Sequence, residues 1–501
     1  MNSYPATMLR KQHVAQTVIL AVYIIFVGLI INAHELWGDE LHSWNIAKAS
    51  DSFSDLITNT RYEGHPPLWY TLMWLLSKCT HNLVYLQYLQ FIIICAAVYL
   101  LLFHSSLPVA AKALLPFGYY FLYEYGAFSR NYAVALLLAF SICILLTRKH
   151  TKTTWLYYLL LFLLSNTHLL GALLAGSLHL CYMLMRRGNK KTIMLHLCAG
   201  VIVFLPALFC IFPPSDSELS MSFWMSHWNS DHLSYIAAAP AKAFFPVPDW
   251  HHHHFWNSNI LADNKSPAAT GSVSLLLSGI AVFIIRRDKK ALTLFLVNLL
   301  LTCVIAFIFP LTSARYVGFI FIAFIIACWL HTAEKPLQPM EMLMLRLLLL
   351  LQICGSIIAV PRDLTQPFSN AYKVNEVLEK IPKGEKTVTD YWCLNNVAAY
   401  ADKPFYCIEL RENTRFLRWD DAFARITAMR EIYTESFNYY FQNNHEDHVL
   451  LLSSNAPAAI NKRDTTVSAH YDFKLADSCT GAIEKHSDLY LYVVRPLSRH
   501  N

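Results

Sequence analysis

The sequence predicts an α-helical polytopic membrane protein with a small α/β domain at its C-terminus. Of its 501 residues, 55% are hydrophobic and only 15% are charged, whereas soluble domains carry about 25% charged residues. Hydrophobic runs recur as far as Val360, and the chain after them is polar and mixed in charge. These observations predict a membrane domain over residues 1–361 and a C-terminal domain over residues 362–501.

The hydrophobic runs predict about eleven transmembrane helices, because a backbone in lipid must satisfy its own hydrogen bonds and a straight span needs about 20 residues. One further apolar segment, Pro66–Lys78, is too short to cross and predicts a helix that lies in the membrane interface. The predicted spans are Val14–Ala33, Leu83–Phe103, Leu107–Tyr123, Tyr132–Thr147, Thr154–Leu169, Leu170–Met185, Ile193–Phe212, Val273–Ile285, Leu292–Pro310, Tyr316–Leu330 and Met342–Val360.

Basic residues gather at one end of these spans and set the predicted orientation, because cytoplasmic helix ends are rich in lysine and arginine. With every cluster cytoplasmic, the N-terminus is cytoplasmic. The first outer loop (34–66), the long outer loop (213–271) and the C-terminal domain then share the opposite face. We expect a multi-pass membrane protein, and that face is periplasmic in a bacterium or luminal in a eukaryote. The clusters are Arg10 and Lys11; Arg148, Lys149 and Lys152; Arg186, Arg187, Lys190 and Lys191; and Arg286, Arg287, Lys289 and Lys290.

The net charge of +6 does not indicate nucleic-acid binding, because the basic residues lie at the ends of hydrophobic runs. A run of four histidines, His251–His254, lies in the long outer loop near Trp250 and Trp256. Such a run can bind a metal, but a solvated loop segment explains it at least as well. No metal site is therefore predicted there.

Two acidic motifs lie on the predicted outer face. Asp39 and Glu40 follow the first span, and adjacent carboxylates there can supply a general base and a second ligand for an acceptor. Glu63 and His65 precede the interfacial helix at a similar depth. Each motif also has an ordinary structural explanation, since acids are favoured near helix N-termini and Gly-His-Pro-Pro is good turn chemistry.

Two arginines enter helices from the same outer face, Arg130 with Tyr132 and Arg315 with Tyr316. Either arginine can hold a phosphate through two hydrogen bonds. A single arginine of this kind commonly only reaches toward the headgroups beside an interfacial tyrosine. Two of them on the face that disfavours positive charge indicate an anionic ligand. His168 lies at the same depth, where a hydrogen-bonded structural histidine is the usual finding.

Taken in order, these segments resemble the GT-C glycosyltransferases, most nearly the family that contains the protein O-mannosyltransferases and the aminoarabinose transferase of lipid A. The resemblance covers residues 10–360, and although each motif alone is weak, five of them in this order on one face are fairly specific. The shared segments are Asp39-Glu40, His65-Pro66-Pro67-Leu68, Arg130-Asn131-Tyr132, Thr167-His168 and Arg315-Tyr316.

The resemblance implies that a sugar passes, with inversion, from a polyprenyl-phosphate donor in the bilayer to an acceptor at the outer face. It implies Asp39 as the base that deprotonates the acceptor and Glu40 as the residue that orients it. The acceptor can be a glycolipid, a polysaccharide or a protein. Some GT-C enzymes use a divalent cation, and the sequence leaves this open.

At the donor, the resemblance makes Arg130 and Arg315 the expected ligands of the lipid phosphate, whose negative charge grows as the sugar leaves. The remaining residues that it implies are Tyr132, Tyr316, His65 and His168 at the phosphate or sugar, and Glu63 at the sugar or acceptor.

The C-terminal region departs from the eukaryotic protein mannosyltransferases because it shows no repeat of the β-trefoil kind. Its alternating segments predict strands at Thr387–Tyr391, Pro404–Leu410, His448–Ser453 and Leu489–Val494, and helices at Asn375–Lys380 and Asp420–Tyr433. This departure favours a bacterial enzyme, and therefore a protein of the inner membrane whose outer face and C-terminal domain are periplasmic. The alternative function is a transporter or flippase of lipid-linked glycans. Internal repeats and polar features near mid-membrane would favour a transporter, and the sequence shows neither.

Overall fold

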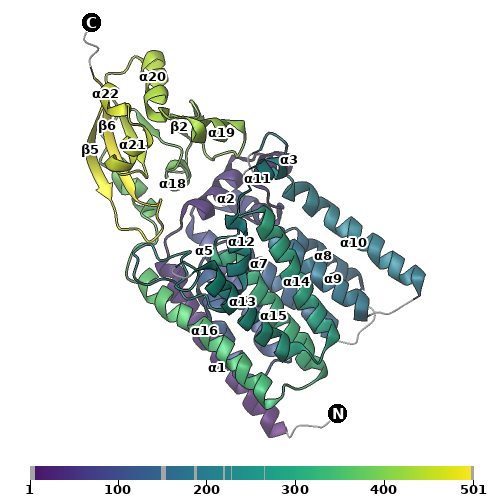
Figure 1. The fold of residues 1–501 in the computed structure, drawn as a ribbon. Coiled ribbons are helices and arrows are strands. Elements are labelled where there is room, and N and C mark those ends of the chain that lie inside the picture. Colours follow the sequence, from purple (N-terminus) through teal and green to yellow (C-terminus); the bar gives the residue numbers. More distant parts are fainter. Residues whose placement is uncertain are drawn as a thin grey trace.

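The computed structural model describes residues 6–147, 154–185, 189–217, 220–226, 228–263 and 266–497. A bundle of long helices carries a β-sheet domain at one end (Figure 1). The predicted fold class, a polytopic helical protein with a small C-terminal α/β domain, is confirmed. Of the basic clusters used for orientation, Arg148, Lys149, Lys152, Arg186 and Arg187 lie outside the described residues.

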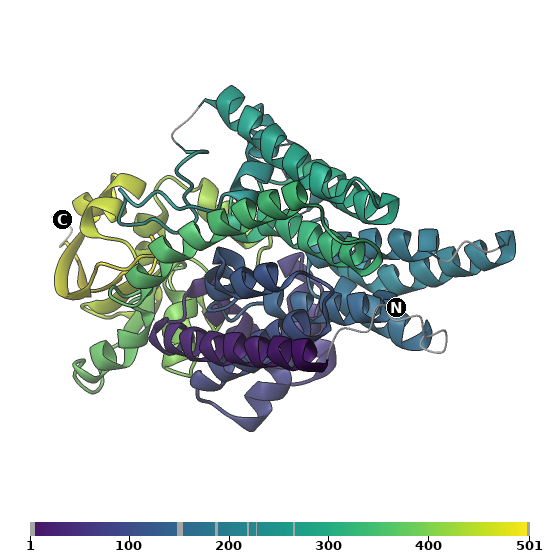
Figure 2. The ribbon, with the colours of Figure 1, turned by 90° about the horizontal axis from the view of Figure 1, so that it is seen from below.

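Within the described residues, seven helices are long and apolar enough to cross a membrane, and three shorter apolar helices accompany them. α15 forms the centre of the bundle, since 83% of its apolar window is buried, against 28% for α1 and for α10. The view from below shows α1 (purple) along the outside of the bundle (Figure 2). The long helices are α1 (Ala6–Ala33), α5 (Val84–His104), α10 (Lys190–Ile211), α13 (Pro267–Ile285), α14 (Lys289–Ile308), α15 (Ala314–Glu334) and α16 (Pro339–Asp363), and the shorter ones are α7 (Asn131–Thr147), α8 (Thr154–Ser165) and α9 (Leu169–Met185).

The predicted single helix over residues 107–123 is wrong. This segment contains the short helix α6 (Val109–Leu114), the 3₁₀ turn η2 (Leu115–Phe117) and the π-helical turn η3 (Tyr120–Glu124). Pro116 lacks the N–H that a continuous helix requires, so the regular hydrogen bonding stops there. The resulting π turn buries Glu124, which accepts hydrogen bonds from Tyr119 Oη (2.8 Å) and Trp256 Nε1 (3.3 Å).

Short helices cover the end of the bundle nearest the C-terminal domain. The segment predicted to lie in the interface forms α4, which begins directly after two prolines, as is favourable for a helix start. The long outer loop contains the helix α12, whose C-terminal half is buried and which packs on α13 and α15. These elements are α2 (Gly38–Ala49), α3 (Phe53–Thr60), η1 (Arg61–Glu63), α4 (Leu68–Cys79), α11 (Met221–Ser226) and α12 (Asp231–Phe244).

The C-terminal domain is built on a six-stranded sheet in the order β3-β2-β1-β4-β6-β5. β1 is parallel to both β2 and β4, and the other pairings are antiparallel. All four predicted strands are present, whereas the helix predicted over 420–433 is divided into α19 and α20. The strands are β1 (Thr387–Thr389), β2 (Phe405–Cys407), β3 (Glu412–Thr414), β4 (Val449–Ser453), β5 (Tyr471–Cys479) and β6 (Leu489–Pro496). The helical elements are η4 (Ala371–Lys373), α17 (Val374–Glu379), α18 (Leu394–Tyr400), α19 (Asp421–Ala428), α20 (Ile432–Asn444), α21 (Pro457–Arg463) and α22 (Val467–His470).

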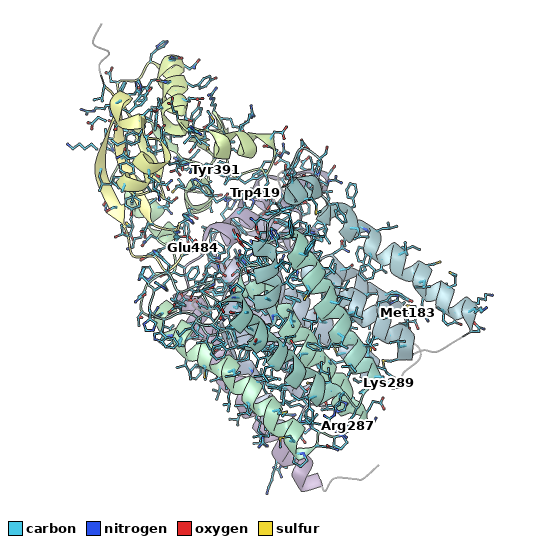
Figure 3. All side chains as sticks on the ribbon, viewed as in Figure 1. Met183, Arg287, Lys289, Tyr391, Trp419 and Glu484 are labelled. Atoms are coloured by element: carbon cyan, nitrogen blue, oxygen red, sulfur yellow. The ribbon has the colours of Figure 1, made fainter. Side chains whose placement is uncertain are left out.

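The two ends of the bundle differ in chemistry. Arg287 and Lys289 lie at the end far from the C-terminal domain (Figure 3), and α1 begins at that same end. The C-terminal domain docks on the opposite end, where α18 packs against α2. This arrangement matches the one-sided distribution of basic residues on which the predicted orientation depends, and the cytoplasmic identity of the basic end stays a prediction.

Candidate active site

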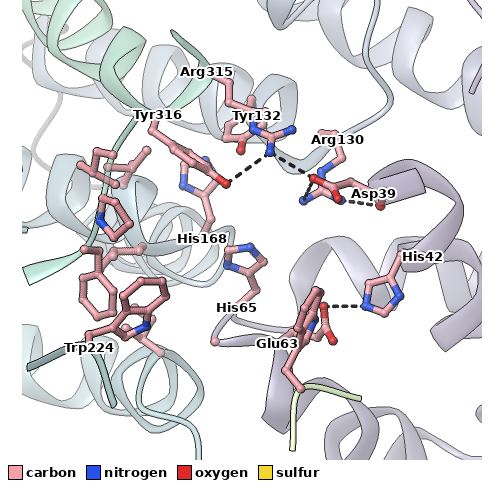
Figure 4. Close-up of a pocket in the computed structure, with 18 residues that line it drawn as sticks. Asp39, His42, Glu63, His65, Arg130, Tyr132, His168, Trp224, Arg315 and Tyr316 are labelled. Atoms are coloured by element: carbon pink, nitrogen blue, oxygen red, sulfur yellow. Dashed lines mark hydrogen bonds and ion pairs between the residues drawn. The ribbon is translucent and has the colours of Figure 1, made fainter. Parts of the chain in front are cut away.

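A cavity of about 370 Å³ opens between the bundle and the C-terminal domain. Every predicted site residue except Glu40 lines it, and Figure 4 shows these side chains pointing toward one another. Its lining therefore joins segments far apart in the chain. The lining residues are Asp39, His42, Glu63, Gly64, His65, Arg130, Tyr132, His168, Leu169, Leu170, Ile211, Trp224, Phe309, Pro310, Leu311, Arg315, Tyr316 and Trp419.

Asp39 lies in the first turn of α2 with its carboxylate between two arginines. Its Oδ2 is 3.1 Å from Arg315 Nη2 and 3.9 Å from Arg130 Nη2. The Asp39 side chain is 39% exposed, whereas those of Arg130 and Arg315 are 8% and 11% exposed. Burial alone would raise the pKa of Asp39, but the charges of Arg315 and Arg130 outweigh it and hold that pKa below its usual value. Asp39 is thus an ionised carboxylate that faces the cavity.

Arg315 is held rigidly from several sides. Its guanidinium lies 5.1 Å from the ring centre of Trp37, 5.3 Å from that of Trp256 and 5.1 Å from that of Tyr316, within the range of cation–π attraction. Tyr125 Oη donates a hydrogen bond of 2.7 Å to the Arg315 carbonyl. These contacts fix the guanidinium at the cavity wall.

Arg130 is held by the same helix that carries Asp39. Its Nη1 donates to the backbone carbonyl of Asp39 and to Ser43 Oγ. Two positive charges therefore lie beside one carboxylate, and this part of the cavity carries an excess of positive charge that favours an anion.

Glu40 points away from the cavity and is fully buried. Its carboxylate accepts hydrogen bonds from the backbone N–H groups of Trp37 (3.1 Å) and Ser129 (2.5 Å), and it lies 3.5 Å from His34 Nε2. Successive residues of a helix point about 100° apart, so Asp39 faces the cavity while the adjacent Glu40 faces the protein interior. In this position Glu40 fixes the residue that precedes Arg130, and it has no direct path to a ligand in the cavity.

A second ion pair lies at the other end of the cavity. His42 Nε2 is 2.9 Å from Glu63 Oε2, and Tyr70 Oη donates to the same oxygen at 3.2 Å. Nδ1 of His42 is 3.1 Å from the side-chain oxygen of Asn395 in the C-terminal domain. Burial lowers the pKa of His42, but the carboxylate of Glu63 outweighs burial and raises it above its usual value. His42 was not predicted from the sequence, although its position three residues after Asp39 places both on one helical face.

Two further histidines, His65 and His168, line the cavity. His168 Nδ1 accepts a hydrogen bond of 2.9 Å from the Gly171 N–H, so in the neutral ring Nε2 carries the proton. Within the described part of the chain, Nε2 of His168 and Nδ1 of His65 are buried without a hydrogen-bond partner. Burial and the charge of Arg130 lower the pKa of His65 to about 4. The cavity wall therefore offers two imidazole nitrogens that can hydrogen-bond a ligand.

The remaining wall of the cavity is mainly apolar. It comes from the ends of α9 and α10, from α11 and from the turn between α14 and α15, and it includes Leu169, Ile211, Trp224, Phe309 and Leu311. Hydrophobic residues near the membrane surface are too common to single out from sequence, so these side chains were not predicted. Trp419 was not predicted because nothing in the C-terminal sequence places it near the spans.

The histidine run of the long outer loop contacts the C-terminal domain instead of the cavity. His253 Nε2 lies 3.1 Å from the carbonyl oxygens of Gly481 and Ala482, and His254 Nδ1 lies 3.1 Å from that of Ile483. Among the described residues, no group of three or more histidine, cysteine, aspartate or glutamate side chains is arranged to hold a metal ion.

The sequence matches no protein-family model, and no curated protein sequence matches it. Among solved structures, the fold is similar to the crystal structure of ArnT from Cupriavidus metallidurans in the apo state, with 11% sequence identity and a TM-score of 0.42. The similarity covers 95% of this chain and 97% of the ArnT chain. A TM-score of this size does not assign the chain to a family. What fold and site define together is a multi-pass membrane protein with an ionic cavity at one end of its bundle.

Proposed function

We propose that this protein is a membrane glycosyltransferase that moves a sugar from a polyprenyl-phosphate donor to an acceptor, at the periplasmic face of a bacterial inner membrane. The observation that carries the proposal is the cavity-facing carboxylate of Asp39 between Arg130 and Arg315, opposite an apolar wall. A base, an anion site and a lipid-compatible surface are the three elements that transfer from a lipid phosphate requires.

In the proposed reaction the two arginines hold the donor phosphate. A phosphodiester that joins sugar and lipid carries one negative charge, and the released lipid phosphate carries two. Rigid guanidinium groups stabilise this growth of charge because they need no rearrangement as the bond breaks. The apolar wall accommodates the first part of the lipid, while Tyr132, Tyr316, His65 and His168 line the space for the phosphate and sugar.

Asp39 is the proposed base: the donor phosphate takes over the contacts with Arg315 and Arg130, and the partly exposed carboxylate turns toward the acceptor on the far side of the sugar. The acceptor oxygen attacks the anomeric carbon from the side opposite the phosphate, the carbon–oxygen bond to the phosphate breaks, and its electron pair leaves with the lipid phosphate. The acceptor proton passes to Asp39 and then to water, and the configuration inverts. A bound phosphate offsets the charge of Arg315 and Arg130, so the pKa of Asp39 rises when donor is present and its basicity increases. Glu40 positions α2 and Arg130, and Glu63 contacts the acceptor or sugar.

The test compares Asp39→Asn with the unaltered protein, purified and reconstituted in nanodiscs. A panel of undecaprenyl-phosphate sugars serves as donor, and a membrane extract of a strain lacking the gene serves as acceptor. Loss of a general base costs about 10²–10⁴-fold in rate, so transfer by Asp39→Asn falls by at least about 100-fold. Its melting temperature falls, because Arg130 and Arg315 are nearly buried and lose their counter-charge, so transfer is compared at a temperature at which both proteins are fully folded.

Asp51→Asn is the matched control, since Asp51 is an exposed acid outside the cavity, and it retains full transfer. Near-normal turnover by Asp39→Asn would remove Asp39 from the role of base. Movement of intact donor across vesicles, without cleavage of the sugar–phosphate bond, would instead establish the transporter alternative. Repeating the assay with EDTA, followed by Mg²⁺ or Mn²⁺, decides whether a divalent cation takes part.

A further inference from the structure

The C-terminal domain reaches into the cavity at Trp419. This residue lies between β3 and α19, and its backbone carbonyl accepts a hydrogen bond of 2.8 Å from Ser217 Oγ in the long outer loop. The neighbouring Arg418 guanidinium lies 4.9 Å from the ring centre of Tyr62. Phe416 packs on a small apolar cluster formed by α2, α3 and α4. The segment is thus docked on the bundle by several contacts, and Trp419 is a built part of the cavity wall.

Trp419 lies at the end of the cavity that holds the second ion pair. Its ring centre is 6.3 Å from that of His42, at an interplanar angle of 72°. Among the described residues, Oε1 of Glu63 is buried without a hydrogen-bond partner. The imidazolium and carboxylate of this pair cancel in net charge, so this end suits a neutral ligand rich in hydroxyl groups better than a second phosphate.

We propose that Trp419 of the C-terminal domain completes the acceptor half of the site, and that the acceptor group bound there is a sugar ring. The ring stacks on Trp419, and its hydroxyls hydrogen-bond Glu63 and His42. A sugar ring offers a C–H face that packs on an indole and a rim of hydroxyls that carboxylate and imidazole groups bind. A serine or threonine side chain of a peptide offers one hydroxyl and no such face. This inference rests on the proposed function and names the acceptor class.

The test uses the full-length protein in nanodiscs with a radiolabelled undecaprenyl-phosphate sugar as donor. Two acceptor fractions from a strain lacking the gene are compared, one of glycolipids and polysaccharides and the other of membrane-protein peptides. Trp419→Leu removes the aromatic face and keeps an apolar side chain, whereas Trp419→Phe keeps an aromatic face. Trp250→Leu is the matched control, since Trp250 lies on the exposed surface of the long outer loop, outside the cavity lining.

We expect label in the carbohydrate fraction and an increase of about tenfold in the half-saturating acceptor concentration for Trp419→Leu, equal to about 1.4 kcal/mol of binding. Trp419→Phe restores most of the affinity, Trp250→Leu changes nothing, and slow donor hydrolysis without acceptor is equal in all four proteins. A role in folding alone would not separate leucine from phenylalanine while sparing hydrolysis.

Label confined to the peptide fraction, or an unchanged half-saturating concentration in Trp419→Leu, would overturn this inference and leave the glycosyltransferase proposal standing. Absence of both transfer and donor hydrolysis in the unaltered protein would overturn the proposed function and this inference with it.

Discussion

The two ends of the cavity each contain an ion pair, but they differ in net charge and in their contact with the C-terminal domain. At one end Asp39 faces Arg130 and Arg315, so two cations meet one anion, and all three come from the membrane bundle. At the other end His42 and Glu63 balance each other and are tied to Asn395 of the C-terminal domain. An anion site is therefore distinguished from a site for a neutral polar group by its net charge, more than by its number of ionic contacts.

The largest effect that separates the two ends is expected from Arg315→Lys. A lysine keeps the charge but cannot hold Asp39 and a phosphate through two directed donors, so kcat/KM for the donor falls by about 100-fold. Kinetics with an undecaprenyl-phosphate sugar at saturating acceptor measure this change. Arg362→Lys is the control, because the Arg362 guanidinium donates hydrogen bonds to the outer-loop carbonyls of Trp250 and His252, outside the cavity lining. Unchanged donor kinetics in Arg315→Lys would place the phosphate elsewhere.

The end of the cavity with the His42–Glu63 pair is expected to depend on pH. Glu63 raises the pKa of His42, so His42 stays protonated above the usual histidine value of about 6.5 and loses its proton as pH rises through the raised value. The stability that the ion pair adds is therefore complete below about pH 6.5, and it is lost as the pH rises through the raised pKa of His42. We expect acceptor affinity to fall over the same pH range, which gives the pH profile of acceptor binding an alkaline limb.

Glu63→Gln moves this alkaline limb to lower pH and weakens acceptor binding by about tenfold, since a charged hydrogen-bond partner contributes about 1.5 kcal/mol or more. Profiles of kcat/KM for the acceptor between pH 5 and 10 measure the shift. The donor KM stays the same, as it does in the exposed control Glu412→Gln. If the alkaline limb keeps its position, the protonation of His42 does not control acceptor binding.

The smallest effect is expected from Asn395→Ala. Loss of one hydrogen bond costs about 1 kcal/mol, so acceptor KM rises by about threefold to fivefold, and the alkaline limb moves slightly to lower pH because Asn395 helps to raise the pKa of His42. Asn413→Ala, at an exposed position of β3, is without effect. A change in donor KM would contradict the assignment of Asn395 to the acceptor end.

The arginine end was well predicted from the sequence because sidedness is a strong physical constraint. Arginines on the face that is otherwise poor in basic residues are easily recognised. The order of the motifs and their common side of the membrane were therefore enough to group Asp39, Arg130 and Arg315. His42 had a usable signal, its helical spacing from Asp39, that was not exploited. Trp419 had none, because only the docking of two domains brings it to the cavity.

The fold was predictable where hydrophobic length decides it and failed where backbone chemistry decides it. Ten of the predicted spans correspond to helices in the described chain, because lipid leaves an apolar segment few alternatives. Residues 107–123 are equally apolar, but Pro116 and Gly118 interrupt the hydrogen bonding, and hydrophobicity does not report that. Adjacent acids pose the same difficulty, since composition cannot tell which of Asp39 and Glu40 faces the cavity.

Outside the cavity lining, His34 joins parts of the chain that are synthesised at very different times. Its Nδ1 lies 2.9 Å from Asp363 Oδ2, across 329 residues, and its Nε2 lies 3.5 Å from Glu40. Burial lowers the pKa of His34, but Asp363 and Glu40 outweigh it and raise that pKa to about 10. Before Asp363 has been synthesised, the buried His34 ring stays neutral, so this ion pair can form only after the end of α16 has been made. A nascent chain truncated before Asp363 therefore lacks the ion pair that holds His34 beside Glu40, the carboxylate that accepts the hydrogen bond from the Ser129 N–H next to Arg130.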